Sequence, residues 1–239
     1  MKVTAVGTSC SWFVRNNTSF IIDEDFIFDI PSGSYKEIIQ KINLEKVKAL
    51  FISHFHSDHF GDFHLIATRF MREFNGSEKL KVYAPKGALD RMIRINYETC
   101  AGCDELSHEN YKRKIEFIDL YDGFEFNFNN YKLKAYKVDH GDVETYGFTI
   151  KDQNNFVVAF SADTRECDNL HKMLESSNVA FIDMSSVKQH KKHLSINDVE
   201  ILIKKYPNCK IYPIHTCDKC QDYARKNMNF VEDGQVFNF

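Results

Sequence analysis

Residues 47–59 read Val47-Lys48-Ala49-Leu50-Phe51-Ile52-Ser53-His54-Phe55-His56-Ser57-Asp58-His59, an apolar run followed at once by three histidines and one aspartate. Residues 47–53 predict a buried strand, and residues 60–74 carry apolar side chains at helical spacing. We therefore expect the polar cluster on a turn at the C-terminal end of a strand, where α/β folds place their functional groups. His54 and His56 would then point to the same side of an extended segment.

Three imidazoles and one carboxylate within six residues indicate a metal site. Buried imidazoles need hydrogen-bonding partners and exposed ones add nothing to stability, so folding alone does not require such a cluster. Imidazole and carboxylate ligands suit Zn²⁺ first and Mn²⁺ second. Because Asp58 and His59 can approach from a second direction, the arrangement favours two ions, which lie about 3.5–4 Å apart in two-metal hydrolytic sites.

The pattern His54-x-His56-x-Asp58-His59 resembles the signature of the metallo-β-lactamase superfamily. This resemblance implies an α/β (α+β) fold, a four-layer αββα sandwich with the metal site at one edge of its two sheets. It also implies three further ligands, each after an apolar run: His140, Asp163 and His215. The implied assignment places His54, His56 and His140 on one ion, Asp58, His59 and His215 on the other, and Asp163 between them. Asp58 would also be catalytic, orienting or deprotonating a water that becomes the attacking hydroxide.

The order of motifs after Asp163 resembles the ribonuclease Z-like branch of that superfamily. By this resemblance Asp183, at the end of a strand, pairs with His193 in His193-Leu194-Ser195. Such a pair would form a proton relay that protonates the alkoxide expelled from a phosphodiester. His190 is the competing candidate for the acid, and a solvated basic run at residues 188–193 is the plainer interpretation.

Two departures separate this chain from transfer-RNA-processing ribonuclease Z. Residues 141–162 leave no room for that enzyme's long tRNA-binding arm, and Asp183 stands where the group usually has Glu. The chain is more similar to arm-less phosphodiesterases, such as the phage anti-Pycsar enzymes that hydrolyse cyclic nucleotides. We therefore expect a two-metal phosphodiesterase acting on a small phosphodiester, with a cyclic nucleotide first. Tyr111 or Phe60 would be candidates to stack on its base.

Alternatives to this activity remain open from the sequence. An RNA endonuclease would use the same site chemistry, and lactonases and thioesterases share the superfamily's ligand pattern. A metal-binding protein without turnover is a further alternative, although it need not keep seven ligands.

Length and composition limit the classes of protein to which this chain can belong. The 239 residues, 43% hydrophobic and 27% charged, predict one globular domain over residues 1–239. A net charge of −3 argues against general affinity for nucleic acid. No apolar run is long enough for a membrane span, and the first residues do not resemble a signal peptide, so we expect a cytoplasmic protein. A homodimer is implied by the resemblance alone.

Seven cysteines include two C-x-x-C pairs, Cys100 with Cys103 and Cys217 with Cys220. Four such thiols would suit an additional structural zinc ion, and coincidental loop cysteines are the alternative.

Several local expectations accompany these motifs. Asp29 is expected to orient the histidine-rich loop or to cap a turn. Residues 100–114 predict an irregular loop, and residues 211–214 the last clear strand. Ser195, with Asp198 three residues later, predicts the start of a helix.

Overall fold

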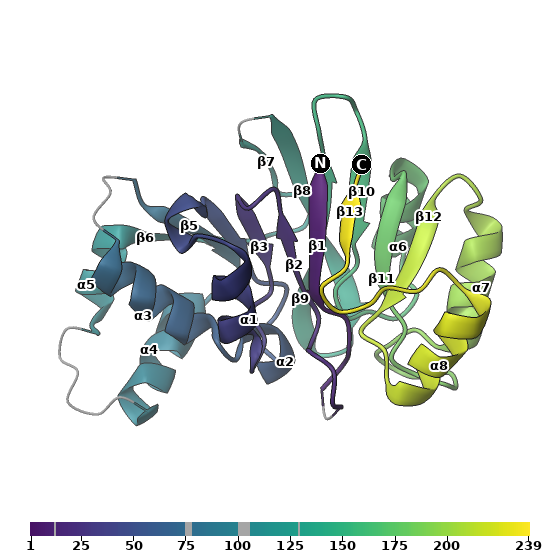
Figure 1. Cartoon of the computed structure of the whole chain (residues 1–239), viewed down its shortest axis with the longest axis horizontal. Coiled ribbons are helices and arrows are strands. Elements are labelled where there is room, and N and C mark those ends of the chain that lie inside the picture. The colour runs from purple at the N-terminus through teal and green to yellow at the C-terminus, as the bar shows by residue number, and fades with distance from the viewer. Residues whose placement is uncertain (12, 75–77, 100–105, 129) are drawn as a thin grey trace.

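The computed structural model describes residues 1–11, 13–74, 78–99, 106–128 and 130–239. Two β-sheets stack against each other, and helices cover the outer face of each, so that the molecule has four layers (Figure 1). This is the αββα architecture expected from the sequence.

The first sheet has seven strands in the order β13-β1-β2-β3-β4-β5-β6. Its N-terminal strands pair antiparallel, whereas β3, β4, β5 and β6 run parallel. Its strands are β1 (Lys2–Gly7), β2 (Ser19–Ile22), β3 (Phe26–Phe28), β4 (Ala49–Phe51), β5 (Leu80–Ala84), β6 (Ile115–Asp119) and β13 (Val236–Asn238).

The second sheet has six strands in the order β12-β11-β10-β9-β8-β7. The long β8–β9 hairpin is antiparallel, and β10, β11 and β12 are parallel to one another. Its strands are β7 (Glu125–Phe128), β8 (Tyr131–His140), β9 (Val143–Lys151), β10 (Val157–Phe160), β11 (Val179–Asp183) and β12 (Lys210–Ile214).

Helices form the two outer layers, to the left and right of the sheets in Figure 1. Those on the first sheet are α1 (Ser34–Lys41), α2 (Ser57–Phe60), α3 (Phe63–Glu73), α4 (Ala88–Thr99) and α5 (His108–Lys114), with a 3-10 turn at Leu44–Lys46. Those on the second sheet are α6 (Asp168–Ser176), α7 (Ile196–Lys205) and α8 (Asp218–Asn227). None of the helices in the described part of the chain has the length and apolar character needed to cross a bilayer.

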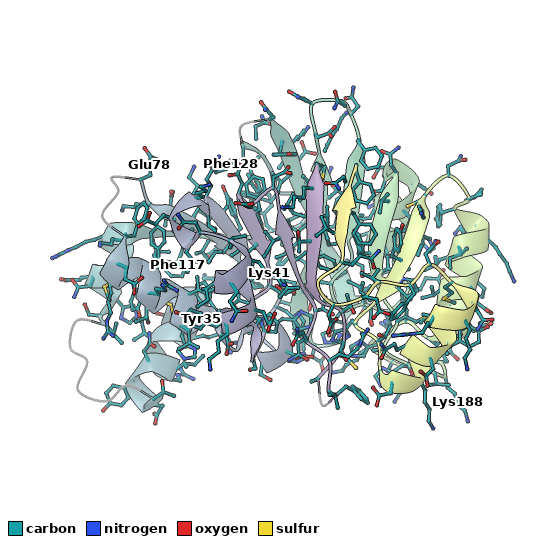
Figure 2. The ribbon with its side chains drawn as sticks, viewed as in Figure 1. Tyr35, Lys41, Glu78, Phe117, Phe128 and Lys188 are labelled. Atoms are coloured by element: carbon teal, nitrogen blue, oxygen red, sulfur yellow. The ribbon has the colours of Figure 1, made fainter. Side chains whose placement is uncertain are left out.

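Phenylalanines fill the space between the sheets. Phe28 stacks on Phe51 with ring centroids 4.6 Å apart, and Phe148 contacts both rings from the second sheet. Figure 2 shows this packed layer of side chains, with Phe128 at its margin beside the ring of Phe26. Strands buried on both faces explain why the sequence reads as short continuous apolar runs rather than as alternating patterns.

The structure corrects three local predictions. Residues 100–114 are not wholly irregular, because α5 forms at their end with Ser107 as its N-cap. The predicted helix over residues 60–74 is broken at Gly61 and Asp62 into α2 and α3. Residues 211–214 are not the last strand, since β13 pairs with β1. The predicted cap at Ser195 is confirmed, with a reciprocal capping box to Asp198.

Candidate metal centre

Seven histidine and aspartate side chains meet at one edge of the two sheets, beyond the C-terminal ends of the strands. The first four follow β4 and enter α2, the fifth is the last residue of β8, and the other two follow β10 and β12: His54, His56, Asp58, His59, His140, Asp163 and His215. Parallel strands bring their carboxyl ends to the same edge, which explains how positions so distant in sequence converge.

Left-handed backbone conformations turn three strand ends toward this edge. Asp29 after β3, Ala162 before Asp163, and His215 after β12 have φ values of 56°, 54° and 54°. Such conformations cost about 1–3 kcal/mol each in residues other than glycine. Their grouping at one edge is typical of a functional site, where surrounding contacts hold the strained backbone in place.

One group of ligand atoms belongs to His54, His56, His140 and Asp163, which lie within 4.8 Å of one another. The Nε2 of His54 is 3.0 Å from the Nδ1 of His56, and the Nε2 of His140 is 3.4 Å from that same atom. Burial lowers the pKa of all three imidazoles, most strongly that of His54. The three rings are therefore neutral and present lone pairs toward a common point.

The second group consists of Asp58, His59 and His215. The Nε2 atoms of the two histidines are 3.3 Å apart, and Asp58 Oδ2 is 3.3 Å from His215 Nε2. Burial disfavours charge on both imidazoles, but the surrounding carboxylates, Asp163 foremost, together outweigh it and raise the pKa of His59 and His215 above the usual range.

Asp163 lies between the two groups. Its Oδ2 is 3.8 Å from the Nε2 atoms of His54 and His140, and its Oδ1 is 3.1 Å from His59 Nε2. Burial opposes its ionisation, but His215 and His59 hold its pKa well below the usual range. A buried carboxylate that faces imidazoles on both sides is placed to bridge two cations.

The donor set fits divalent metal ions. Imidazole nitrogens face one another at distances where two lone pairs would repel without a proton or cation between them. The carboxylates that attract protons to His59 and His215 would equally attract a cation. Nitrogen and oxygen ligands in these proportions suit Zn²⁺ or Mn²⁺.

Asp29 supports the histidine-rich loop from behind. Its carboxylate accepts hydrogen bonds from the backbone N–H and the hydroxyl of Ser53, both at 2.7 Å, and lies 2.7 Å from His59 Nδ1. A hydrogen bond at Nδ1 directs Nε2 of His59 toward the centre. The orienting role expected for Asp29 thus has its contacts in the structure. Ser53, which also lies 3.0 Å from His54 Nδ1, had no sequence signal of its own.

Asp183 and His193 form a pair beside this cluster. Asp183 Oδ2 is 2.8 Å from His193 Nδ1, and its Oδ1 is 3.4 Å from Nδ1 of His215. Burial would lower the pKa of His193, but Asp183 raises it above the usual range. His190, the competing candidate, instead accepts a hydrogen bond from the backbone N–H of Lys192. The geometry therefore pairs Asp183 with His193.

A cavity of about 590 Å³ opens over the cluster. Its walls come from the segments that follow β1, β4, β10, β11 and β12: Cys10, Ser11, Phe13, His56, Ser57, Asp58, Asp163, Ser185, Ser186, His190, His193, His215 and Cys217. The two aromatic residues expected to contact a base are absent from this wall. Tyr111 is fully buried between Thr68 and Asn96, and Phe60 is buried against Phe63, so that expectation was wrong.

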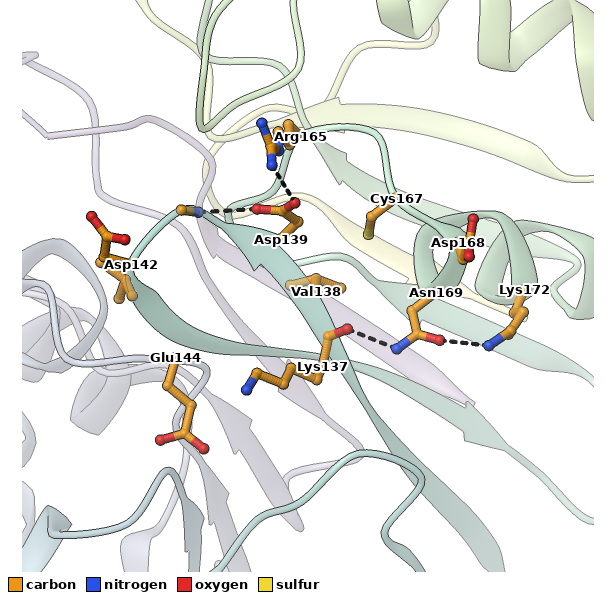
Figure 3. A pocket seen from close by; sticks show the side chains of 12 residues that line it. Lys137, Val138, Asp139, Asp142, Glu144, Arg165, Cys167, Asp168, Asn169 and Lys172 are labelled. Carbon is orange, nitrogen blue, oxygen red and sulfur yellow. Dashed lines mark hydrogen bonds and ion pairs between the residues drawn. The ribbon is translucent and has the colours of Figure 1, made fainter.

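A second cavity, of about 880 Å³, lies beside the β8–β9 turn and contains none of the candidate ligands (Figure 3). Several of its polar groups pair with one another. Arg165 forms an ion pair with Asp139 at 2.7 Å, and the Asn169 amide donates to the carbonyl of Lys137. These mutual pairings leave it without a converging set of catalytic groups.

Of the two C-x-x-C pairs, the structure describes Cys217 and Cys220. Cys217 caps α8, and hydrogen bonds with Cys220 lower the pKa of the Cys217 thiol to about 6. Cys100 and Cys103 lie outside the described residues. A zinc ion shared by the four thiols stays a prediction. Cys10, which is outside the two C-x-x-C pairs, lines the cavity over the cluster.

Solved structures share this fold. The metallo-β-lactamase fold protein YhfI from Bacillus subtilis matches 99% of each chain with a TM-score of 0.77 and 16% identity. A diphosphatase from the PhnP family matches all of this chain and 97% of its own, with a TM-score of 0.79 and 16% identity. The short form of human tRNase Z matches all of this chain and 99% of its own, with a TM-score of 0.74 and 16% identity. The metallo-β-lactamase fold expected from the histidine motif is confirmed.

Curated relatives include ribonuclease Z from Archaeoglobus fulgidus, which is 30% identical over 156 residues, 62% of this chain and 47% of that protein. Ribonuclease Z from Staphylococcus haemolyticus is 31% identical over 162 residues, 63% of this chain and 49% of that protein. The chain thus spans about half the length of the curated relatives it matches.

The chain has the metallo-β-lactamase fold, and its histidines and aspartates form a cluster that could hold metal ions. A family model described as "Anti-Pycsar protein Apyc1" matches residues 1–237. Because this match covers nearly the whole sequence, the chain belongs to the Anti-Pycsar protein Apyc1 family.

Proposed function

We propose that this protein is a two-metal phosphodiesterase that hydrolyses a small phosphodiester, with a cyclic nucleotide as its substrate. The observation that carries the proposal is the Asp183–His193 pair at 2.8 Å, placed beside a cluster able to hold two cations. A phosphodiester expels a poor leaving group, an alkoxide, which needs a proton in the transition state. A thioester expels a thiolate, which is less basic and depends less on such a donor.

The ligand groups suggest the assignment of the ions. One Zn²⁺ or Mn²⁺ ion would take His54, His56 and His140, the other would take Asp58, His59 and His215, and Asp163 would contact both. When bound, such ions acidify a water and neutralise charge on phosphoryl oxygens. Asp58 projects into the cavity, and His215 holds it ionised by a hydrogen bond, so that it can orient or deprotonate that water.

His193 supplies the acid in this scheme. Its Nδ1 is held by Asp183, which leaves Nε2 free to carry a proton to the leaving oxygen, and its side chain lines the cavity. Asp183 is fully buried, and its contact with His215 ties the acid to the ligand cluster. General acid catalysis of this kind contributes about 10²–10⁴-fold to a rate.

The size of the cavity and a lysine on the loop beside it support a small anionic substrate. Its volume of about 590 Å³ lies in the range of pockets that enclose small ligands. Between His140 and Asp163 the chain forms only the turn into β9 and β10, with no projecting arm. The loop beside the cavity carries Lys188, which points out into solvent (Figure 2), and positive charge near a pocket raises the local concentration of anions.

The test is a panel of 3′,5′- and 2′,3′-cyclic nucleotides beside a structured pre-tRNA, each with Zn²⁺ or Mn²⁺ supplied. We expect cyclic-nucleotide cleavage that is abolished by Asp58→Ala. His193→Ala should lower kcat about 10²–10⁴-fold while leaving metal content unchanged. His190→Ala is the matched control, because it removes a cavity-lining imidazole without a carboxylate partner, and its kcat should stay within a few-fold of wild type. Equal losses in both variants would remove the assignment of His193.

An RNA endonuclease is the second candidate, favoured by the ribonuclease Z relatives. Cleavage of the pre-tRNA alone in the same panel would establish it. If a fully metallated sample cleaves neither cyclic nucleotides nor the pre-tRNA, the phosphodiesterase proposal is wrong, and lactones and thioesters are the substrates to test. The homodimer implied by the resemblance is measured separately, by the molar mass of the protein in solution.

A further inference from the structure

Phe13 stands out in the wall of the cavity over the metal centre. It is the one large apolar side chain among the described residues that line this cavity, since the other members are candidate ligands, histidines, serines and cysteines. The Phe13 side chain is 36% exposed. About a third of its surface still contacts water, and a ligand in the cavity could bury that part.

The segment around Phe13 is fastened to the metal centre on both sides. Before it, the Ser11 N–H donates to Asp58 Oδ2 at 3.2 Å. After it, Arg15 Nη2 donates to the Thr216 hydroxyl, next to His215, at 3.2 Å. These two contacts place Ser11 and Arg15, on either side of Phe13, beside candidate ligands of the second metal ion.

The cavity wall also offers polar groups suited to the edge of a planar ligand. Ser185 and Ser186, from the segment after β11, are half-buried and line the same cavity as Phe13. An aromatic face combined with hydroxyl groups is the combination by which proteins hold nucleobases: the ring stacks on the base and the polar groups contact its edge.

We propose that Phe13 is the residue on which the base of the substrate stacks, and that it thereby determines the preference of this enzyme for nucleotides over other small phosphodiesters. The inference rests on the proposed function and makes it more specific. Every nucleobase has an aromatic face, so stacking on Phe13 favours a base in general, and the choice among bases falls to contacts at the edge.

The experiment compares Phe13→Ala, Phe13→Leu and Phe13→Tyr with the wild-type protein on two substrates. One is the cyclic nucleotide that the wild type cleaves best, and the other is methyl riboside 3′,5′-cyclic phosphate, which has no base. Stacking on an aromatic side chain corresponds to about 5- to 150-fold in affinity. Phe13→Ala should raise KM for the nucleotide by this factor and leave KM for the base-less substrate and the metal content unchanged. Phe13→Leu should resemble Phe13→Ala, and Phe13→Tyr should restore the wild-type KM.

Val14→Ala is the matched control. Val14 is the neighbouring residue of the same loop, is fully exposed and does not line the cavity, so its truncation should change neither KM. Equal KM values for wild type and Phe13→Ala on the nucleotide would overturn the inference, as would equal increases on both substrates. If the wild type cleaves no cyclic nucleotide, the proposed function fails by that result. The role of Phe13 is then tested by calorimetric binding of a nucleoside monophosphate to the metal-loaded protein. Equal affinity of Phe13→Ala and the wild type for this nucleotide would refute the stacking role.

Discussion

Replacing Asp29 with asparagine changes one oxygen atom behind the metal centre. In the wild type, Oδ1 accepts from the Ser53 N–H, while Oδ2 accepts from the Ser53 hydroxyl and lies 2.7 Å from His59 Nδ1. If the amide oxygen keeps the backbone contact, the amide NH₂ faces two other donors. His59 must then move or shift its proton to Nε2, which is the atom that a metal ion would need.

The expected effect is a loss of metal affinity rather than of folding. Partners that orient a metal-binding histidine are typically worth 10- to 100-fold in affinity, which is about 1.4–2.7 kcal/mol. Asparagine tolerates the left-handed backbone at residue 29, where φ is 56°, so the substitution adds little strain. We therefore expect Asp29→Asn to bind the ion assigned to Asp58, His59 and His215 about 10- to 100-fold less tightly, with unfolding of the metal-free protein nearly unchanged.

The assay is competition with a chromophoric chelator, followed by metal analysis of the dialysed protein. Asp152→Asn is the matched control, because Asp152 is buried to the same degree, 8% exposed against 7%, and caps a turn far from the site. Its contacts with Asn154 and Phe156 both use Oδ1, which an asparagine retains. Wild-type affinity for both ions in Asp29→Asn would refute the reasoning, as would an equal loss in the two variants.

Three further outcomes follow from the same structure. Removing the ions with a chelator should lower Tm by about 5–11 °C. An ion whose free concentration is 100 times its Kd stabilises the folded protein by about 2.7 kcal/mol, and each kcal/mol shifts Tm by about 2–4 °C at this chain length. An unchanged Tm in a thermal unfolding scan would contradict metal binding to the folded state. Gly61→Ala should lower the free energy of unfolding by about 1–3 kcal/mol and weaken metal retention, because a Cβ there would lie 2.5 Å from the carbonyl oxygen of Ser57, a backbone atom of α2. Denaturant unfolding measures the loss of stability, and a wild-type free energy of unfolding would contradict the prediction. Ser195→Ala removes the capping box of α7 and should lower the free energy of unfolding by about 1 kcal/mol without changing metal affinity. A loss of bound metal in this variant would contradict the prediction and show that the cap also supports the metal centre.

Prediction from the sequence succeeded where the signal is local. The strand before His54 and the cap at Ser195 depend on residues adjacent in the chain, and the structure has both. α5 was missed because its residues are mostly charged and polar, so its short apolar face gives little periodicity. β13 was missed because its three residues are held as a strand by pairing with β1, at the opposite end of the chain.

The sequence by itself determined the ligand chemistry: three imidazoles and a carboxylate within six residues predict a metal site whatever surrounds them. Only the tertiary structure decided which other side chains lie beside this metal site. It brought His140 and Asp163 to the histidine-rich loop by aligning strand ends, and paired Asp183 with His193 rather than with His190. It also buried Tyr111 and Phe60 and left Phe13 at the cavity. The physical reason is that residue type sets which bonds a side chain can make, whereas proximity and exposure arise from packing between segments far apart in the chain.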